Sequence, residues 1–159
     1  MSEKKRILNE RLASIVATLR HGEMIYVADA GSGTSSKSII PLAPEVEYLD
    51  LGVVTGSPSF DDVVSTLVAA GDFEAAIVAK DMPLANPKHF NLLTDLFGED
   101  KVYTILYAPD LYDARNRCKA VIQTGDYSIH ANAIIVAGYP SADIDLDILL
   151  GKKVFSTDE

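Results

Sequence analysis

The chain has 159 residues, the size of one ordinary domain, and 48% of them are hydrophobic, which is typical of a globular protein with one core. Its formal net charge of -9 at pH 7 disfavours nucleic acid and anionic lipid as partners, because both bind basic surfaces. We therefore expect a single domain over residues 1–159 whose partner is neither nucleic acid nor membrane.

The terminal and apolar segments predict a cytoplasmic protein. The charged stretch Met1–Arg6 leads into an amphipathic pattern without the apolar core of an export signal. The longest apolar runs, such as Ala131–Gly138, are far shorter than the roughly 20 residues of a membrane-spanning helix. The single cysteine, Cys118, has no second cysteine for an internal disulfide, and a reducing cytoplasm fits this best.

The first predicted elements are one helix and one strand. Asn9 can cap a helix in which apolar residues recur at spacings of three and four. The apolar run Met24–Ala28 after it is short enough for a buried strand. That strand ends in Asp29, and residues 32–38 are rich in glycine, serine and threonine, which indicates a mobile loop.

The middle of the chain continues the alternation of strands and helices. A strand is expected over residues 49–54, and Ser59 can cap the helix that follows. Ala75–Ala79 is the third predicted strand, and Asn86 and Pro87 can cap and open the next helix.

The last third supplies the remaining strands. Strands are expected over residues 102–107, Ala120–Gln123 and Ala131–Ala137, and the last two can pair as an antiparallel hairpin. From residue 141, aspartates alternate with apolar residues, which predicts an extra edge element in a short acidic C-terminal segment. The whole order predicts a compact α/β fold with a largely parallel central sheet flanked by helices.

Two candidate acid/base residues flank the first predicted strand. His21 follows the first helix, and Asp29 stands at the carboxyl end of the strand, where ligands bind in open α/β sheets. Whether the two side chains meet depends on how the loops fold. The alternative is structural, since His21 can interact with a helix dipole and Asp29 can form a turn.

Other polar motifs are less specific. The loop Gly31–Ser38 is similar to a phosphate-binding loop but lacks its glycine spacing, so a nucleotide- or phosphate-binding module is a weaker hypothesis than a flexible loop. His130 and Asn132 share one side of a predicted strand, where they could bind sugar hydroxyls or satisfy a turn. His89 is expected on the solvated surface of its helix. No metal-ligand spacing is recognised, so we expect no metal.

Seven segments, taken in order, share one pattern with a known family. They are Ile7–Asn9, Leu19–Glu23, Val27–Gly31, Gly56–Phe60, Glu74–Ala79 with Asn86–Pro87 after it, Ala120–Asp126 and Ala131–Ile135. Together they resemble the ribose pyranase / fucose mutarotase (RbsD/FucU-like) family over about residues 7 to 140.

The resemblance implies a compact α/β domain in a ring-shaped homo-oligomer, often a decamer, with sugar bound in clefts near subunit contacts. It also implies interconversion of anomeric or ring forms of a free monosaccharide, such as ribose or fucose, without a cofactor. By resemblance, His21 would be the proton donor and Asp29 a sugar-binding or base residue. The alternative is a non-catalytic sugar-binding or regulatory protein of the same fold.

The chain departs from the family pattern in three places. His130 stands where the family has a tyrosine, and it can still hydrogen-bond but has a different reach. The family's second basic residue falls near Ala108, where Asp110 is the closest polar substitute. The loop after Asp29 is several residues longer than in the family. The expected catalytic residues are His21 and Asp29, and the expected substrate-binding residues are His130, Asn132 and Asp110.

Overall fold

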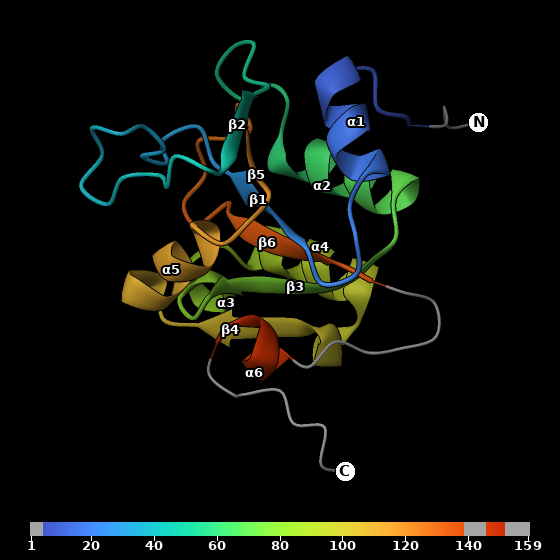
Figure 1. Cartoon of the computed structure of the whole chain (residues 1–159). Coiled ribbons are helices and arrows are strands. Elements are labelled where there is room, and N and C mark those ends of the chain that lie inside the picture. The colour runs from blue at the N-terminus through green and yellow to red at the C-terminus, as the bar shows by residue number, and fades with distance from the viewer. Residues whose placement is uncertain (1–4, 139–145, 152–159) are drawn as a thin grey trace.

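The computed structural model describes residues 5–138 and 146–151 as one sheet with helices on both faces (Figure 1). The strands are β1 (Met24–Ala28), β2 (Glu47–Asp50), β3 (Phe73–Ala79), β4 (Val102–Ile105), β5 (Ala120–Gln123) and β6 (Ala133–Ala137). The helices are α1 (Glu10–Ala17), α2 (Phe60–Ala70), α3 (Met82–Ala85), α4 (Pro87–Phe97), α5 (Tyr112–Arg115) and α6 (Leu146–Leu149), with a 3-10 turn at Glu99–Lys101 and a kinked turn at Tyr107–Leu111. None of the helices in the described ranges is long and apolar enough to cross a membrane.

The sheet is largely parallel, as predicted, with one strand reversed. Its order is β2-β5-β1-β6-β3-β4, and β6 runs antiparallel to both β1 and β3. The predicted hairpin between β5 and β6 is wrong, because β1 lies between them. In the structure β5 pairs with β2 and β1, and β6 pairs with β1 and β3, so other strands occupy both edges of each.

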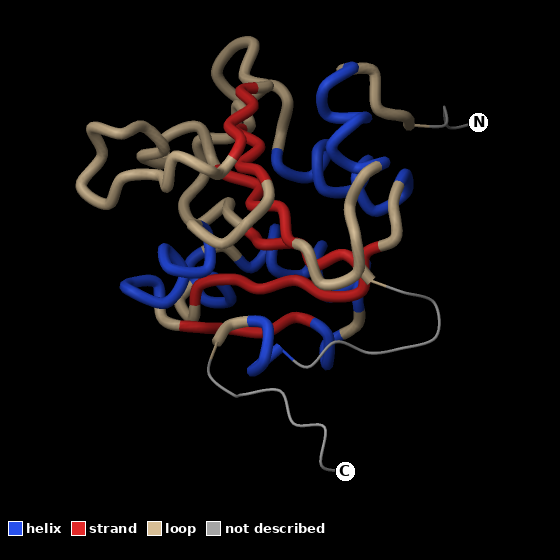
Figure 2. Tube along the Cα trace, viewed as in Figure 1, coloured by secondary structure: helices blue, strands red, loops and turns tan. Residues whose placement is uncertain are grey.

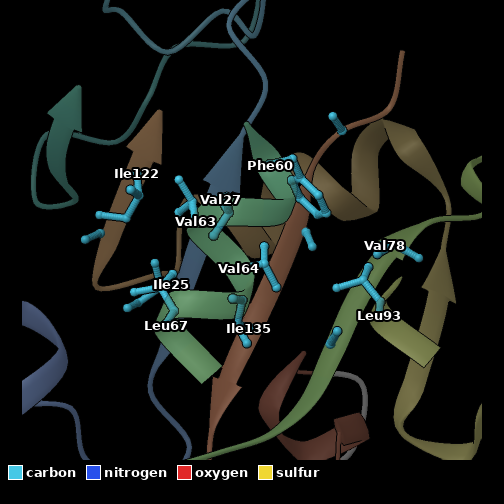
Figure 3. Packing of buried hydrophobic residues seen from close by; sticks show 14 of the residues in the cluster. Ile25, Val27, Phe60, Val63, Val64, Leu67, Val78, Leu93, Ile122 and Ile135 are labelled. Carbon is cyan, nitrogen blue, oxygen red and sulfur yellow. The ribbon is translucent and has the colours of Figure 1, made fainter. Parts of the chain in front are cut away.

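Alternate residues of the central strands face two separate cores. Ile25 and Val27 of β1 pack against α1, α2 and α4 (Figure 3), whereas Met24 and Tyr26 pack against α5 and the segment before it. This two-residue period explains why β1 is an uninterrupted apolar run, since each of its faces is covered by a helical layer. The expected α/β fold is therefore confirmed.

The predicted helix starts are confirmed by side-chain caps. The side chains of Asn9, Ser59 and Asn86 accept from backbone amides three residues ahead at 2.9, 3.1 and 3.2 Å. Each bond satisfies an amide that has no partner inside its helix. Local sequence alone is sufficient to place these three helices.

Two predicted elements differ clearly from the structure, and β3, β4 and β6 each differ from their predicted bounds by two residues at one end. β2 ends at Asp50 rather than continuing to residue 54, because the Asp50 carboxylate accepts from the Gly52 amide at 2.8 Å and turns the chain. At the C-terminus, residues 146–149 form the short helix α6, so the expected edge element is wrong there. The rest of that predicted element, residues 141–145, lies outside the described residues.

Every parallel strand ends at the same edge of the sheet, and β6 begins there. Ala28, Asp50 and Gln123, the last residues of β1, β2 and β5, lie in register. The long loop after β1 projects from this edge (Figure 2). Polar side chains from several connections therefore gather at one end of the sheet, which is the usual ligand-binding edge of an open α/β sheet.

A close backbone contact fixes the connection after β5. The Gly125 amide donates to the Pro58 carbonyl at 2.9 Å, and a Cβ atom on Gly125 would lie 2.6 Å from the Ser57 carbonyl carbon. We predict that Gly125→Ala lowers the free energy of unfolding by about 1–3 kcal/mol, because backbone on both sides must move. Urea unfolding measures this change.

The matched control for that substitution is Gly31→Ala. A Cβ atom there would meet its nearest neighbour, Oδ1 of Asp29, at an ordinary 3.6 Å. Equal unfolding midpoints for the two alanine variants would show that the Ser57 contact does not constrain the fold.

Candidate functional site

The carboxyl end of β1 and the start of β6 are joined by a reciprocal pair of hydrogen bonds. Nδ2 of Asn132 donates to Oδ2 of Asp29 at 2.9 Å, and the Asp29 amide donates to Oδ1 of Asn132 at 2.7 Å. The Ser32 hydroxyl lies within 3.1 Å of Oδ1 of Asp29, and the Gly31 amide donates to the same oxygen at 2.9 Å. The carboxylate is thus oriented from several sides and stays half-exposed at the sheet edge.

His130 lies beside this pair. It has a positive φ of 54° in the turn that leads into β6, a conformation uncommon for residues other than glycine and found at tight turns. Its ring meets the Tyr107 ring at 5.4 Å, edge to face. The structure therefore brings three of the predicted site residues, Asp29, His130 and Asn132, to one edge of the sheet.

Tyr107 and Tyr112 extend the cluster, and the sequence analysis missed both. Their hydroxyl oxygens are 2.7 Å apart, within hydrogen-bond distance, and Tyr107 is 39% exposed. One feature of the sequence could have indicated Tyr107. It directly precedes Ala108, the position where the family resemblance implies a basic residue.

The long loop after Asp29 is fastened by a buried arginine. Arg115 donates to the carbonyl oxygens of Gly33, Ile40 and Pro41 at 3.0, 2.9 and 3.0 Å, and it is 1% exposed. Its guanidinium carbon lies 5.0 Å from the centre of the Tyr112 ring. The predicted mobile loop is therefore tied to the tyrosine pair through this side chain.

The surroundings of Tyr107 and Tyr26 keep both hydroxyls protonated. Burial, the hydrogen bond to Tyr112 and the charge of Asp29 raise the pKa of Tyr107 to about 12, although Arg115 acts in the opposite direction. Burial also raises the pKa of Tyr26, which lies beneath the cluster on β1. Near neutral pH both hydroxyls can donate hydrogen bonds, and neither serves as a strong base.

His21 does not join this cluster within one chain. It lies in the turn before β1, so the whole strand, about 16 Å long, separates it from Asp29. Figure 1 shows that turn and the loop after β1 at opposite ends of the strand. His21 lines a cavity of about 850 Å³ between α1 and the end of β6, and its Nε2 atom lies 3.9 Å from Oε1 of Glu74.

Asp110 is also separate from the Asp29 cluster. It lines a small cavity of about 60 Å³ with Asp113, Arg117 and Leu150. The kinked turn that exposes Tyr107 places Asp110 in this separate cavity, because Ala108 has extended backbone angles in the middle of the turn. The expected substrate-binding role of Asp110 therefore gains no support from a place among the residues around Asp29.

Comparison with known proteins assigns the family. The sequence profile of the RbsD / FucU transport protein family matches residues 2–140. The chain belongs to this family. A D-ribose pyranase of Thermoanaerobacter sp. (strain X514) is 31% identical over 136 residues, which cover 86% of this chain and 97% of the relative.

Two solved structures of the RbsD / FucU family share the fold. Bacillus subtilis RbsD complexed with D-ribose has a TM-score of 0.74 and 30% identity, over 87% of this chain and 98% of that one. The fucose mutarotase of Streptococcus pneumoniae in complex with L-fucose has a TM-score of 0.65 and 17% identity, over 83% of this chain and 94% of that one. At 17% identity, the second likeness concerns the fold alone.

A polar cavity lies next to the loop after Asp29, on the β2 side of the sheet. Its volume is about 540 Å³, and it is lined by parts of the glycine- and serine-rich loop together with Tyr48, Asp50 and Gln123. Gln123 organises the loop by donating to the carbonyl oxygens of Asp29 and Ser32 at 2.9 and 3.1 Å. The lining carries a carboxylate and no lysine or arginine, so it suits a phosphate group poorly.

His89 is buried, so the predicted surface position is wrong. Its Nε2 atom lies 3.1 Å from Oδ2 of Asp126 and 3.0 Å from the Ser128 hydroxyl. Its Nδ1 atom lies 2.6 Å from Asp61, poorly aligned for a hydrogen bond, so that contact is mainly electrostatic. The imidazole packs on the Phe60 ring, which removes it from solvent.

This buried network supports the segment that carries His130 and Asn132. Oδ2 of Asp126 accepts from the Phe60 amide at 3.0 Å, and its backbone carbonyl accepts from the Ala30 amide at 2.7 Å. Asn86 donates to the Ile129 carbonyl at 2.7 Å. The first turns of α2 and α4 thus hold the connection between β5 and β6 in place. Among the described residues, no group of three or more histidine, cysteine or carboxylate side chains is arranged to hold a metal ion.

Asp126 gives this network a measurable pH dependence. Burial by itself would raise its pKa, but hydrogen bonds from Ser128 and the Phe60 amide, with the charge of His89, lower the pKa below the ordinary 3.8. Because the folded pKa is depressed, the stabilisation is present above about pH 4 and is lost as pH falls through the folded pKa.

We predict that Asp126→Asn destabilises the protein by about 1–3 kcal/mol at neutral pH, since buried donors lose their charged acceptor. The deficit relative to the unmodified protein should shrink below about pH 4. Thermal unfolding from pH 3 to pH 7 measures it, with Asp95→Asn on the exposed side of α4 as control. A deficit that stays constant across this range would contradict the assignment.

Proposed function

We propose that this protein is a cofactor-independent isomerase that interconverts ring or anomeric forms of a free monosaccharide such as ribose or fucose. The observation that carries the proposal is the oriented Asp29–Asn132 pair at the sheet edge, in a chain that belongs to the RbsD / FucU family. The relatives named D-ribose pyranase and the ribose complex of Bacillus subtilis RbsD support the choice of sugar.

The reaction requires two proton transfers. A proton leaves the anomeric hydroxyl, and a proton reaches the ring oxygen, so that the ring opens and recloses in another form. Asp29 is the base in this scheme, and His130 and Asn132 bind sugar hydroxyls. Positioned groups of this kind each accelerate proton transfer by roughly 100- to 10,000-fold.

His21 acts as the proton donor from a neighbouring copy. Within one chain, the length of β1 keeps His21 away from Asp29, whereas an oligomer can place His21 of one copy against the sheet edge of the next. The family resemblance, with sugar in clefts near subunit contacts, supports this arrangement. We therefore propose a single-domain subunit in a cytoplasmic homo-oligomer, such as a decameric ring.

The charge of the site favours an unmodified sugar. Asp29 is a carboxylate, and the adjacent cation Arg115 is buried on backbone carbonyls. A sugar phosphate would therefore bring its negative charge towards the Asp29 carboxylate, which repels it, while the Arg115 guanidinium is already engaged. The same balance and the net charge of -9 exclude nucleic acid and anionic membrane from our proposal.

His21→Ala and Asp29→Asn should each abolish the accelerated exchange of sugar ring forms, because each removes one of the two proton carriers. NMR saturation transfer on ribose, fucose and related sugars measures the exchange. Full activity in either variant would remove that residue from the mechanism.

Mixing the two inactive variants tests the shared site. If His21 and Asp29 of one site come from different copies, random co-assembly of equal amounts of the two variants restores about a quarter of the sites. A restored site has its His21 from an Asp29→Asn subunit and its Asp29 from a His21→Ala subunit, and each of these choices has a chance of about one half. Co-expressed or refolded mixtures should therefore regain activity, whereas separately assembled variants stay inactive. Mixtures that regain nothing would place both residues in one chain or outside the mechanism.

The second candidate is a non-catalytic sugar-binding protein. It is favoured by one observation, the alanine at position 108 where the family has its second basic residue. Saturable sugar binding without any acceleration of exchange would select this alternative.

A further inference from the structure

The tyrosine pair stands at the edge of the sheet where the proposed sugar site lies. Tyr107 follows β4, Tyr112 begins α5, and their rings meet at 5.2 Å with an angle of 70°. The exposed fraction of Tyr107 is 39%, so its hydroxyl is accessible from solvent. The 2.7 Å separation of the two oxygens fixes their relative position.

A ring contact relates this pair to Asp29, and an electrostatic interaction accompanies it. The Tyr107 ring packs against His130, which lies two residues before the Asn132 that binds Asp29. Tyr107 and Asp29 also interact electrostatically, and both act on the buried Tyr26. The hydroxyl pair and the carboxylate therefore belong to one cluster.

The two halves of this cluster have complementary hydrogen-bonding chemistry. Asp29 presents carboxylate oxygens, which accept hydrogen bonds. The tyrosine pair holds two hydroxyl protons, of which one lies between the two oxygens and the other is available to a ligand. A sugar, whose ring oxygen accepts and whose hydroxyls do both, needs both kinds of partner.

Arg115 determines which tyrosine is fixed and which is available. Its guanidinium lies over the Tyr112 ring and is held by three carbonyl oxygens, so Tyr112 is anchored from behind. Tyr107 is the more accessible partner, and its hydroxyl is oriented by the anchored one.

We propose that Tyr107 donates a hydrogen bond to the bound sugar and that Tyr112 positions it, so that a neutral hydroxyl pair replaces the family's basic residue missing at Ala108. This inference rests on the proposed sugar isomerase function. Tyr107 touches substrate in this scheme, whereas Tyr112 acts through Tyr107.

The test compares Tyr107→Phe, Tyr112→Phe and the double variant with Tyr103→Phe. Tyr103 lies on β4 and packs against the core that contains Met24 and Tyr26. Tyr103→Phe therefore removes a tyrosine hydroxyl at a position outside the Tyr107–Tyr112 pair. Tyr107→Phe should slow sugar exchange by at least about tenfold, and Tyr112→Phe by about two- to fivefold. The double variant should be no slower than Tyr107→Phe, and Tyr103→Phe should match the unmodified protein.

Titrating the sugar separates binding from exchange in each variant. A hydrogen bond from Tyr107 that strengthens as the ring opens lowers the maximal exchange rate more than the sugar affinity when it is removed, and a merely structural change would not produce that split. Unfolding midpoints and assembly size, measured in parallel, exclude misfolded variants from the comparison. If the unmodified protein accelerates exchange and the tyrosine variants equal it, this inference is wrong. If the unmodified protein accelerates nothing, the proposed function itself fails.

Discussion

The antiparallel insertion of β6 between β1 and β3 is the constraint on which the site depends. Because Val27 pairs with Ala133, the residue before β6 reaches the carboxyl end of β1. Asn132 and Asp29 can then exchange two hydrogen bonds, which leave the carboxylate oriented at the edge. A parallel β6 would begin at the other end of the sheet, and the polar residues before it, His130 and Asn132, would lie far from Asp29.

Local pattern was sufficient for most of the elements, whereas strand order was not. Capping residues and apolar runs are short-range signals, and Asn9, Ser59 and the run Met24–Ala28 were predicted correctly from them. The partners of β6 depend on which strand edges remain unpaired across the whole sheet, and no local pattern encodes that. The burial of His89 was missed for the same reason, since Asp126 and Phe60 reach it only after folding.

The candidate site was predictable where its residues lie at strand ends. Asp29 and Asn132 were recognised because each adjoins a predicted strand end, but their proximity follows from the antiparallel pairing of β1 with β6, which was not predicted. His21 flanks the same strand at its other end, and five extended residues separate it from Asp29 in any single chain. Tyr107 escaped prediction because Pro109, which favours the extended backbone seen at Ala108, signals a break in the chain but not that the Tyr107 ring meets His130.

One buried arginine holds the loop after Asp29 in place. A loop that buries several carbonyl oxygens needs a cation with several donors, and Arg115 fulfils that need at Gly33, Ile40 and Pro41. The cation that stabilises the loop is thereby removed from the surface that meets ligand. At this edge the structure places the Asp29 carboxylate, the His130 imidazole and the hydroxyls of Tyr107 and Tyr112, a set that can accept and donate hydrogen bonds to the sugar that we propose.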